Sequence, residues 1–148
     1  MHKGFSVRDQ ASRILVVDDM AMSRATAKKM LNELGFMDVS VAADGEEAWN
    51  QLFEADKAQK PFVLVVTDWM MPILDGMGLL RKIKKSGWSF FPAILLATAE
   101  SDSAQVSQAV KEGISGYVRK PLTRPDLLAA LNRVHDSVQK AQTGLDRG

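Results

Sequence analysis

The stretch FVLVVTDWMMP, residues 62–72, decides the fold of this 148-residue chain. It begins with five apolar residues, 62–66, and passes through Thr67 to the carboxylate of Asp68, with Pro72 four residues later. A short apolar run rich in β-branched residues and bounded by turn-forming residues is typical of a strand buried on both faces of a parallel sheet. Asp68 is therefore expected where this strand leaves the core, at a sheet edge where ligands commonly bind.

The composition is that of one globular domain. Hydrophobic residues make up 46% of the chain, charged residues make up 25%, and the formal net charge is +1. Such a balance provides no strong field to recruit nucleic acid or a membrane surface, so we expect neither as a partner. The absence of cysteine excludes disulfides, thiolate metal sites and a cysteine nucleophile. Because no apolar run suits a signal peptide or a membrane span, we expect a cytoplasmic protein.

Short apolar runs alternate with segments of helical periodicity along the chain. We expect strands at about 13–17, 39–42, 62–67, 93–98 and 116–119, and helices at about 21–34, 45–55, 77–86, 103–112 and 125–139. Each connection is long enough to hold a helix, which predicts an α/β fold with a five-stranded parallel sheet and helices on both faces. The domain is expected over 13–140, between an N-terminal tail or loosely packed segment, 1–12, and a frayed C-terminal tail, 141–148.

Polar residues follow four of the five predicted strands. Asp18 and Asp19 follow the first strand, Asp68 ends the third, Thr98 ends the fourth, and Lys120 follows the fifth. The carboxyl ends of parallel strands share one edge, so these side chains are expected to meet in one site. Each residue alone has an ordinary explanation, such as a helix cap or a solvated charge. Fold stability does not require an acid or a base at every one of these positions.

The chemistry of this set indicates a cation and an anion together. Three carboxylates and one lysine leave a formal charge of −2, and like charges about 4 Å apart near a protein surface repel by roughly 4 kcal/mol. Oxygen ligands without histidine or cysteine favour a hard ion, so we predict Mg²⁺, with Mn²⁺ as an alternative. The cation, the Lys120 ammonium and the Thr98 hydroxyl would bind a phosphoryl group. Asp68 is the candidate nucleophile for an aspartyl phosphate.

These motifs resemble those of response-regulator receiver domains, particularly the stand-alone chemotaxis regulators of that family. The resemblance covers roughly residues 12–140. It rests on RILVVDD at 13–19, TDWMMP at 67–72 with DG at 75–76, TAE at 98–100 and GYVRKP at 116–121. It implies a flavodoxin-like, CheY-like fold with strand order 2-1-3-4-5, and a cis peptide bond between Lys120 and Pro121.

The resemblance also assigns roles around the acceptor. It implies that Asp68 is the phosphoacceptor and that Asp19 binds the metal directly. Asp18 would hold the metal largely through water, and the backbone carbonyl of Met70 would be a further ligand beside Asp68.

A second group of roles concerns the phosphoryl group and the signal. The resemblance implies that Thr98, Ala99 and Lys120 bind the phosphoryl oxygens, and that Tyr117 changes rotamer on activation. It implies that the side chains at Met70 and Glu100 tune hydrolysis of the acyl phosphate.

Two positions depart from the family pattern. Met70 stands where the best-known chemotaxis proteins have asparagine, which bears on the lifetime of the phosphate. Leu122 stands where phenylalanine is common.

The expected function is that of a monomeric, single-domain response regulator in a two-component phosphorelay. A histidine kinase (CheA-like) would phosphorylate Asp68, and the surface around Tyr117 would bind a flagellar switch component or a histidine phosphotransferase. Chemotaxis is preferred, and a phosphate shuttle or sink in a multi-step phosphorelay is the alternative. The protein would catalyse only its own Mg²⁺-dependent phosphorylation and dephosphorylation. An Asp-nucleophile phosphatase is a remote alternative, because Met70 stands where such enzymes need a second acid.

Overall fold

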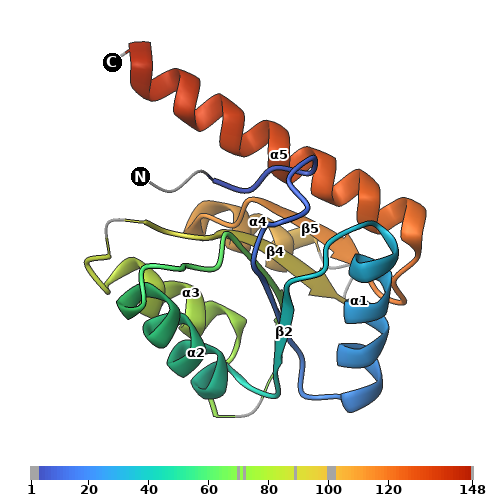
Figure 1. Cartoon of the computed structure of the whole chain (residues 1–148). Helices are drawn as coiled ribbons and strands as arrows, with labels where there is room; N and C mark the ends of the chain where they lie inside the picture. The colour runs from blue at the N-terminus through green and yellow to red at the C-terminus, as the bar shows by residue number, and fades with distance from the viewer. Residues whose placement is uncertain (1–3, 70, 72, 89, 100–102, 148) are drawn as a thin grey trace.

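The fold alternates strands and helices along the described residues of a computed structural model, namely 4–147 except 70, 72, 89 and 100–102 (Figure 1). The elements in chain order are β1 Ile14–Val17, α1 Ala21–Glu33, β2 Val39–Ala42, α2 Gly45–Lys57, β3 Leu64–Asp68, α3 Gly76–Lys84, β4 Ala93–Thr98, α4 Ser103–Glu112, β5 Gly116–Arg119 and α5 Arg124–Arg147. The α/β alternation expected from the sequence is confirmed.

The strands form one parallel sheet in the order β2-β1-β3-β4-β5. The central strand β3 pairs with β1 through Leu64 and Ile14, and with β4 through Asp68 and Ala97. The predicted strand order is confirmed, and all five carboxyl ends lie along one edge.

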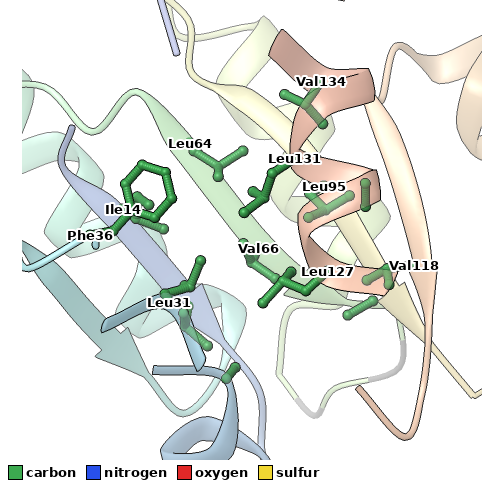
Figure 2. Packing of buried hydrophobic residues seen from close by; sticks show 14 of the residues in the cluster. Ile14, Leu31, Phe36, Leu64, Val66, Leu95, Val118, Leu127, Leu131 and Val134 are labelled. Carbon is green, nitrogen blue, oxygen red and sulfur yellow. The ribbon is translucent and has the colours of Figure 1, made fainter. Parts of the chain in front are cut away.

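The sheet is covered on both faces, which explains the uninterrupted apolar runs in its strands. All four residues of β1 and all six of β4 are buried. Alternate strand residues face two separate clusters, as the two-residue period of a strand requires. One cluster packs the sheet against α1 and α5 (Figure 2), and the other packs it against α2, α3 and α4.

Helix ends in this fold are fixed by local chemistry. The side chain of Asp44 accepts a hydrogen bond from the Glu47 N–H at 2.8 Å and caps α2. Asp75 caps α3 by accepting from the Gly78 N–H at 2.7 Å. After the C-terminal end of α1, Gly35 has a φ of 104°, a left-handed conformation that glycine adopts without a steric penalty. The Asp44 and Asp75 caps explain why the predicted starts of α2 and α3 agree closely with the structure.

The N-terminal segment, expected as a tail or loosely packed, is anchored to the core. Phe5 is fully buried, and its ring centroid lies 5.9 Å from that of Phe36. The backbone N–H of Val7 donates to Nδ1 of His135 on α5 at 3.3 Å. The segment therefore packs as part of the domain between the end of α1 and the middle of α5.

The last helix is longer than its apolar spacing indicates. α5 continues to Arg147, beyond the end expected near residue 139 and through most of the stretch expected to fray. In Figure 1 its C-terminal part projects past the sheet. None of the helices in the described ranges, α5 included, combines the length and the apolar character that a membrane crossing needs.

Replacing Phe5 with alanine tests whether the N-terminal segment stabilises the domain. Phe5→Ala should lower the free energy of unfolding by about 3 kcal/mol, the usual cost of emptying a buried phenylalanine site. Urea denaturation would measure the loss, with Arg8→Ala at an exposed position of the same segment as the control. A loss below about 1 kcal/mol for Phe5→Ala would show that the segment adds little.

Candidate functional site

A lysine joins the ends of three strands at the carboxyl edge of the sheet. The Lys120 Nζ, just beyond β5, lies 2.5 Å from Oδ2 of Asp18 and 2.9 Å from Oδ2 of Asp68. These residues are separated by 102 and 52 positions in the chain. The structure thus brings together the residues that the strand-end pattern places in one site. The Lys120–Pro121 peptide bond is cis, as the family resemblance implies.

Three carboxylates form a compact acidic cluster. Asp18, Asp19 and Asp68 each offer an oxygen, and these oxygens lie within 4.8 Å of one another. Asp18 is buried, Asp68 is half-buried and Asp19 is exposed. Lys120 balances only one of the three negative charges, so the cluster favours entry of a cation. An all-oxygen donor set of this size fits a hard divalent ion such as Mg²⁺.

The loop after β1 is held by bonds that sequence reasoning did not foresee. The Asp18 Oδ1 accepts a hydrogen bond from the Met20 N–H at 2.9 Å, and its backbone carbonyl accepts one from Arg24 at 2.8 Å. Both carboxylate oxygens of Asp18 are therefore engaged, one by Met20 and one by Lys120. Arg24 reaches the loop from the first turns of α1, and nothing in its sequence spacing identified this contact.

A glycine allows the loop after β3 to fold back on the acceptor. A Cβ at Gly76 would lie 2.5 Å from the backbone carbonyl oxygen of Asp68, which is closer than real contacts allow. The Gly76 N–H donates to the Trp69 carbonyl at 3.1 Å and fixes this return. The Asp75-Gly76 pair thus supplies both the cap of α3 and the tight approach beside Asp68.

The fourth and fifth strands bring the predicted phosphoryl-binding residues beside the cluster. Thr98 is 2% exposed at the end of β4, and its carbonyl accepts a hydrogen bond from the Lys120 N–H at 2.9 Å. Ala99 follows and is exposed. Tyr117, the predicted switch residue, lies on β5 and is 43% exposed, so its ring is on the surface in this state.

Two predicted site residues fall outside the described part of the chain. Met70, as carbonyl ligand and as a side chain that tunes hydrolysis, is one of them, and Glu100 is the other. Their roles stay predictions.

Two opposing effects set the protonation of Lys120. Burial on its own lowers the pKa of the ammonium, but hydrogen bonds to Asp18 and Asp68 and the charges of both carboxylates outweigh it. The net result is a pKa raised above the ordinary value of 10.5. The stabilisation of the fold by the contacts of the Lys120 ammonium with these carboxylates is therefore present at neutral pH. It is lost only as the pH rises through this raised pKa. Lys120 is a cation throughout the physiological range.

Trp69 provides a natural probe of the cluster. It is next to Asp68 and is 8% exposed, within the cluster of buried side chains that faces α2 and α3. Trp49 and Trp88 stack on each other with centroids 4.9 Å apart, and Lys82 lies over Trp49. Mg²⁺ titration should change the Trp69 fluorescence, because a divalent charge at the carboxylates alters the field at the adjacent indole.

The matched variant for this titration is Trp69→Phe, which leaves the Trp49 and Trp88 pair as background. It should lose the metal-dependent change in emission. If the change persisted at full size, the metal would lie away from Asp68.

Comparisons with known proteins identify the family of the chain. Residues 14–132 match the response regulator receiver domain. The chemotaxis proteins CheY-3 of Vibrio cholerae serotype O1 and CheY of Pseudomonas aeruginosa are each 33% identical to the chain. The two alignments span 88% and 85% of this chain and 97% and 98% of those proteins.

Solved structures of receiver proteins are similar to this chain in fold. A response regulator receiver domain protein from Clostridium thermocellum is similar with a TM-score of 0.73 and 32% identity, over 88% of this chain and 98% of the other. Vibrio cholerae chemotaxis protein CheY4 has a TM-score of 0.72 and 29% identity, over 84% of this chain and 98% of the other.

Proposed function

The chain belongs to the response regulator receiver domain family, and from this premise we propose that it is the receiver domain of a CheY-like response regulator and is phosphorylated on Asp68. The observation that carries the proposal is the bridge from Lys120 to Asp18 and Asp68, at 2.5 and 2.9 Å. This bridge joins a nucleophile, a cation and a buried carboxylate at a single sheet edge. Such an arrangement suits transfer of a phosphoryl group to a carboxylate.

The acidic cluster would hold the metal on which this reaction depends. Asp18, Asp19 and Asp68 fit Mg²⁺ by donor type and by the 4.8 Å spread of their oxygens. When bound, Mg²⁺ supplies positive charge that offsets the carboxylates and the incoming phosphoryl oxygens. Asp19 is exposed and suits a direct ligand, while Asp18 already has both oxygens engaged within the protein.

Each side chain of the site would have a separate role in transfer of the phosphoryl group. A carboxylate oxygen of Asp68 attacks the phosphorus, and the bond from phosphorus to the donor breaks. Lys120, charged at neutral pH, exchanges a carboxylate contact for a phosphoryl oxygen. The Thr98 hydroxyl at the end of β4 donates to another oxygen. The protein acts as catalyst only for its own phosphorylation and dephosphorylation, and a histidine kinase is the proposed donor.

The signal would leave through β5 and the helices beside it. Phosphorylation adds about −1.5 to −2 charge and three acceptor oxygens next to Thr98. When Thr98 turns toward the phosphoryl group, it vacates space that the exposed ring of Tyr117 can fill. The Tyr117 carbonyl accepts a long hydrogen bond from Arg133 of α5 at 3.5 Å, which connects this strand to the last helix. The proposed output surface is therefore formed by α4, β5 and α5.

Partner affinity tests both the function and this route. Beryllofluoride should strengthen binding of a flagellar switch component to the wild-type protein by about tenfold, a typical allosteric coupling. Thr98→Ala and Tyr117→Ala should each remove most of this gain. Phe53→Ala, at an exposed aromatic residue on α2, is the matched control and should keep it. A full gain in both site variants would refute the coupling route.

The identity of the protein that binds the activated chain distinguishes two forms of the function, motor control and a phosphorelay shuttle. Motor control is favoured because relatives with 33% identity over most of the chain are chemotaxis proteins. If the activated protein retains a histidine phosphotransferase and passes its phosphoryl group to it, the shuttle in a phosphorelay replaces the motor output.

A further inference from the structure

Two tryptophans form a stacked pair between α2 and the segment after α3, two helices that lie side by side on one face of the sheet (Figure 1). The rings of Trp49 on α2 and Trp88, just after α3, have centroids 4.9 Å apart and an interplanar angle of 12°. The Lys82 ammonium lies 4.9 Å from the centroid of the Trp49 ring and adds a cation–π contact. Both tryptophans are only half-buried, so the pair is fixed in place while part of its surface faces solvent.

An exposed aromatic side chain continues this surface along α2. Phe53 follows Trp49 by four residues, on the same side of the helix, and it is 46% exposed. Exposed aromatic surface with a polar rim marks sites where proteins bind one another, and tryptophan contributes more binding energy there than most residues. Because Lys82 and Trp88 already fix the Trp49 ring, little entropy would be lost at this ring on binding. We define the tryptophan face as Trp49, Phe53, Lys82, Lys85 and Trp88.

The charge beside these aromatic side chains is positive. From the start of α3 to the end of β4 the chain contains four cations and no acidic residue. Glu112, at the end of α4, engages two of the cations: its carboxylate lies 3.0 Å from Arg81, and its carbonyl accepts from Lys84. Lys82 and Lys85 are exposed, and neither forms a salt bridge within the part of the chain that the structure describes. The tryptophan face therefore favours a ligand with negative charge.

The tryptophan face is separate from the phosphorylation site and from the proposed output surface. None of its residues contributes to the acidic cluster or belongs to α4, β5 or α5. α2 and α3 cover the face of the sheet opposite the one that α1 and α5 cover. A short segment bound to the tryptophan face would therefore leave Asp68 and the output surface accessible, and its affinity should be the same with and without a phosphoryl group.

We propose that the tryptophan face binds an acidic segment of a partner protein, anchored by an apolar side chain, and that it does so independently of phosphorylation. The apolar side chain packs on the stacked tryptophans and on Phe53, and carboxylates on either side of it pair with Lys82 and Lys85. Such a contact tethers the regulator to its partner before and after the acceptor changes state.

The shape of the charge distribution favours a narrow segment over a flat anionic membrane. α2 exposes Glu46 and Glu54 on the same helix as Phe53. A membrane broad enough to cover both helices would bring its negative charge against these carboxylates, whereas an extended segment can follow the cations of α3 alone.

Isothermal titration of the full chain with three synthetic peptides tests the proposal. The first peptide has leucine and phenylalanine at its centre and aspartate or glutamate elsewhere, the second replaces the two apolar residues with alanine, and the third replaces the acids with lysine. The first should bind at least about tenfold more tightly than the other two, the usual cost of losing an interface anchor or its charge partners. It should shift the indole N–H NMR signals of Trp49 and Trp88 but not that of the buried Trp69. Beryllofluoride should leave its affinity unchanged.

Charge reversal locates the peptide on the protein. The double variant Lys82→Glu with Lys85→Glu should weaken binding of the first peptide by at least about tenfold, because two attractions become repulsions. The matched control is Lys28→Glu with Lys29→Glu, at exposed positions of α1 over the other face of the sheet, and it should keep the affinity. Labelling of Asp68 by acetyl phosphate should be the same in both double variants.

Four results would overturn the inference and leave the proposed phosphorylation of Asp68 intact. The first is equal or absent binding of the three peptides, and the second is equal affinity in the two double variants. The third is binding of the wild type to anionic lipid vesicles in place of the acidic peptide, which would make the face a membrane contact. The fourth is a dimer, seen by sedimentation, that Phe53→Ser dissociates, which would make it a contact between copies of this chain.

Discussion

Asp68→Asn should take up no phosphoryl group from acetyl phosphate and Mg²⁺, whereas the wild-type protein should gain one. The amide has nearly the shape of the carboxylate, so the fold is kept while the nucleophilic oxygen is lost. Lys120 loses the charge partner that lies 2.9 Å away, but its contact with Asp18 remains. Intact-protein mass spectrometry would measure the incorporation in both proteins.

Peptide mapping supplies the control for this experiment. In the wild-type protein the label should lie on the peptide that carries Asp68. Label on Asp18 or Asp75 would show that another carboxylate is the acceptor. Asp18 is the stronger competitor, because Lys120 Nζ lies 2.5 Å from its carboxylate, against 2.9 Å for that of Asp68.

Asp19→Ala should also lose phosphorylation of Asp68, but for a different reason, which is the loss of the metal. Asp19 is exposed and contributes an oxygen to the acidic cluster, so its removal should spare the fold. Mg²⁺ affinity should fall by roughly 100-fold or more. Removing a residue that only supports a metal ligand can already lower metal affinity by about 100-fold, and a direct ligand should matter at least as much. Without the cation, the remaining carboxylates repel an incoming phosphoryl group, and labelling of Asp68 should fall with the affinity.

Isothermal titration with Mg²⁺ would measure this loss, with Asp136→Ala on α5 as an exposed aspartate remote from the cluster. Raising the Mg²⁺ concentration should restore part of the labelling in Asp19→Ala and none in Asp68→Asn. Unchanged affinity in Asp19→Ala would remove Asp19 from the set of ligands.

The central sheet and its edge were predictable because they depend on short-range patterns. A run such as AILLAT, 93–98, is apolar at every position, and only a strand covered on both faces buries it fully. Once the strands are parallel, their carboxyl ends share an edge, so the meeting of Asp18, Asp68 and Lys120 follows from topology. No long-range contact had to be known in advance.

The features that sequence reasoning missed depend on contacts between distant segments. Phe5 occurs in a polar stretch without a period, and its burial depends on Phe36 being within reach. Arg24 reads as an ordinary helix cation until its hydrogen bond to the Asp18 carbonyl is seen. The extension of α5 to Arg147 lacks apolar spacing, since its last turns leave the sheet.

The hydrogen bond from Val7 to His135 makes one amide a reporter on the opposite end of the chain. It joins positions 128 residues apart, and contacts that close such long loops form late because of their entropic cost. Local opening in proteins proceeds in cooperative units rather than residue by residue. The exchange rate of the Val7 amide with deuterated solvent therefore reports how often the contact between the N-terminal segment and α5 opens. That single resonance would show whether this contact between the two ends of the domain loosens or tightens when Asp68 is phosphorylated.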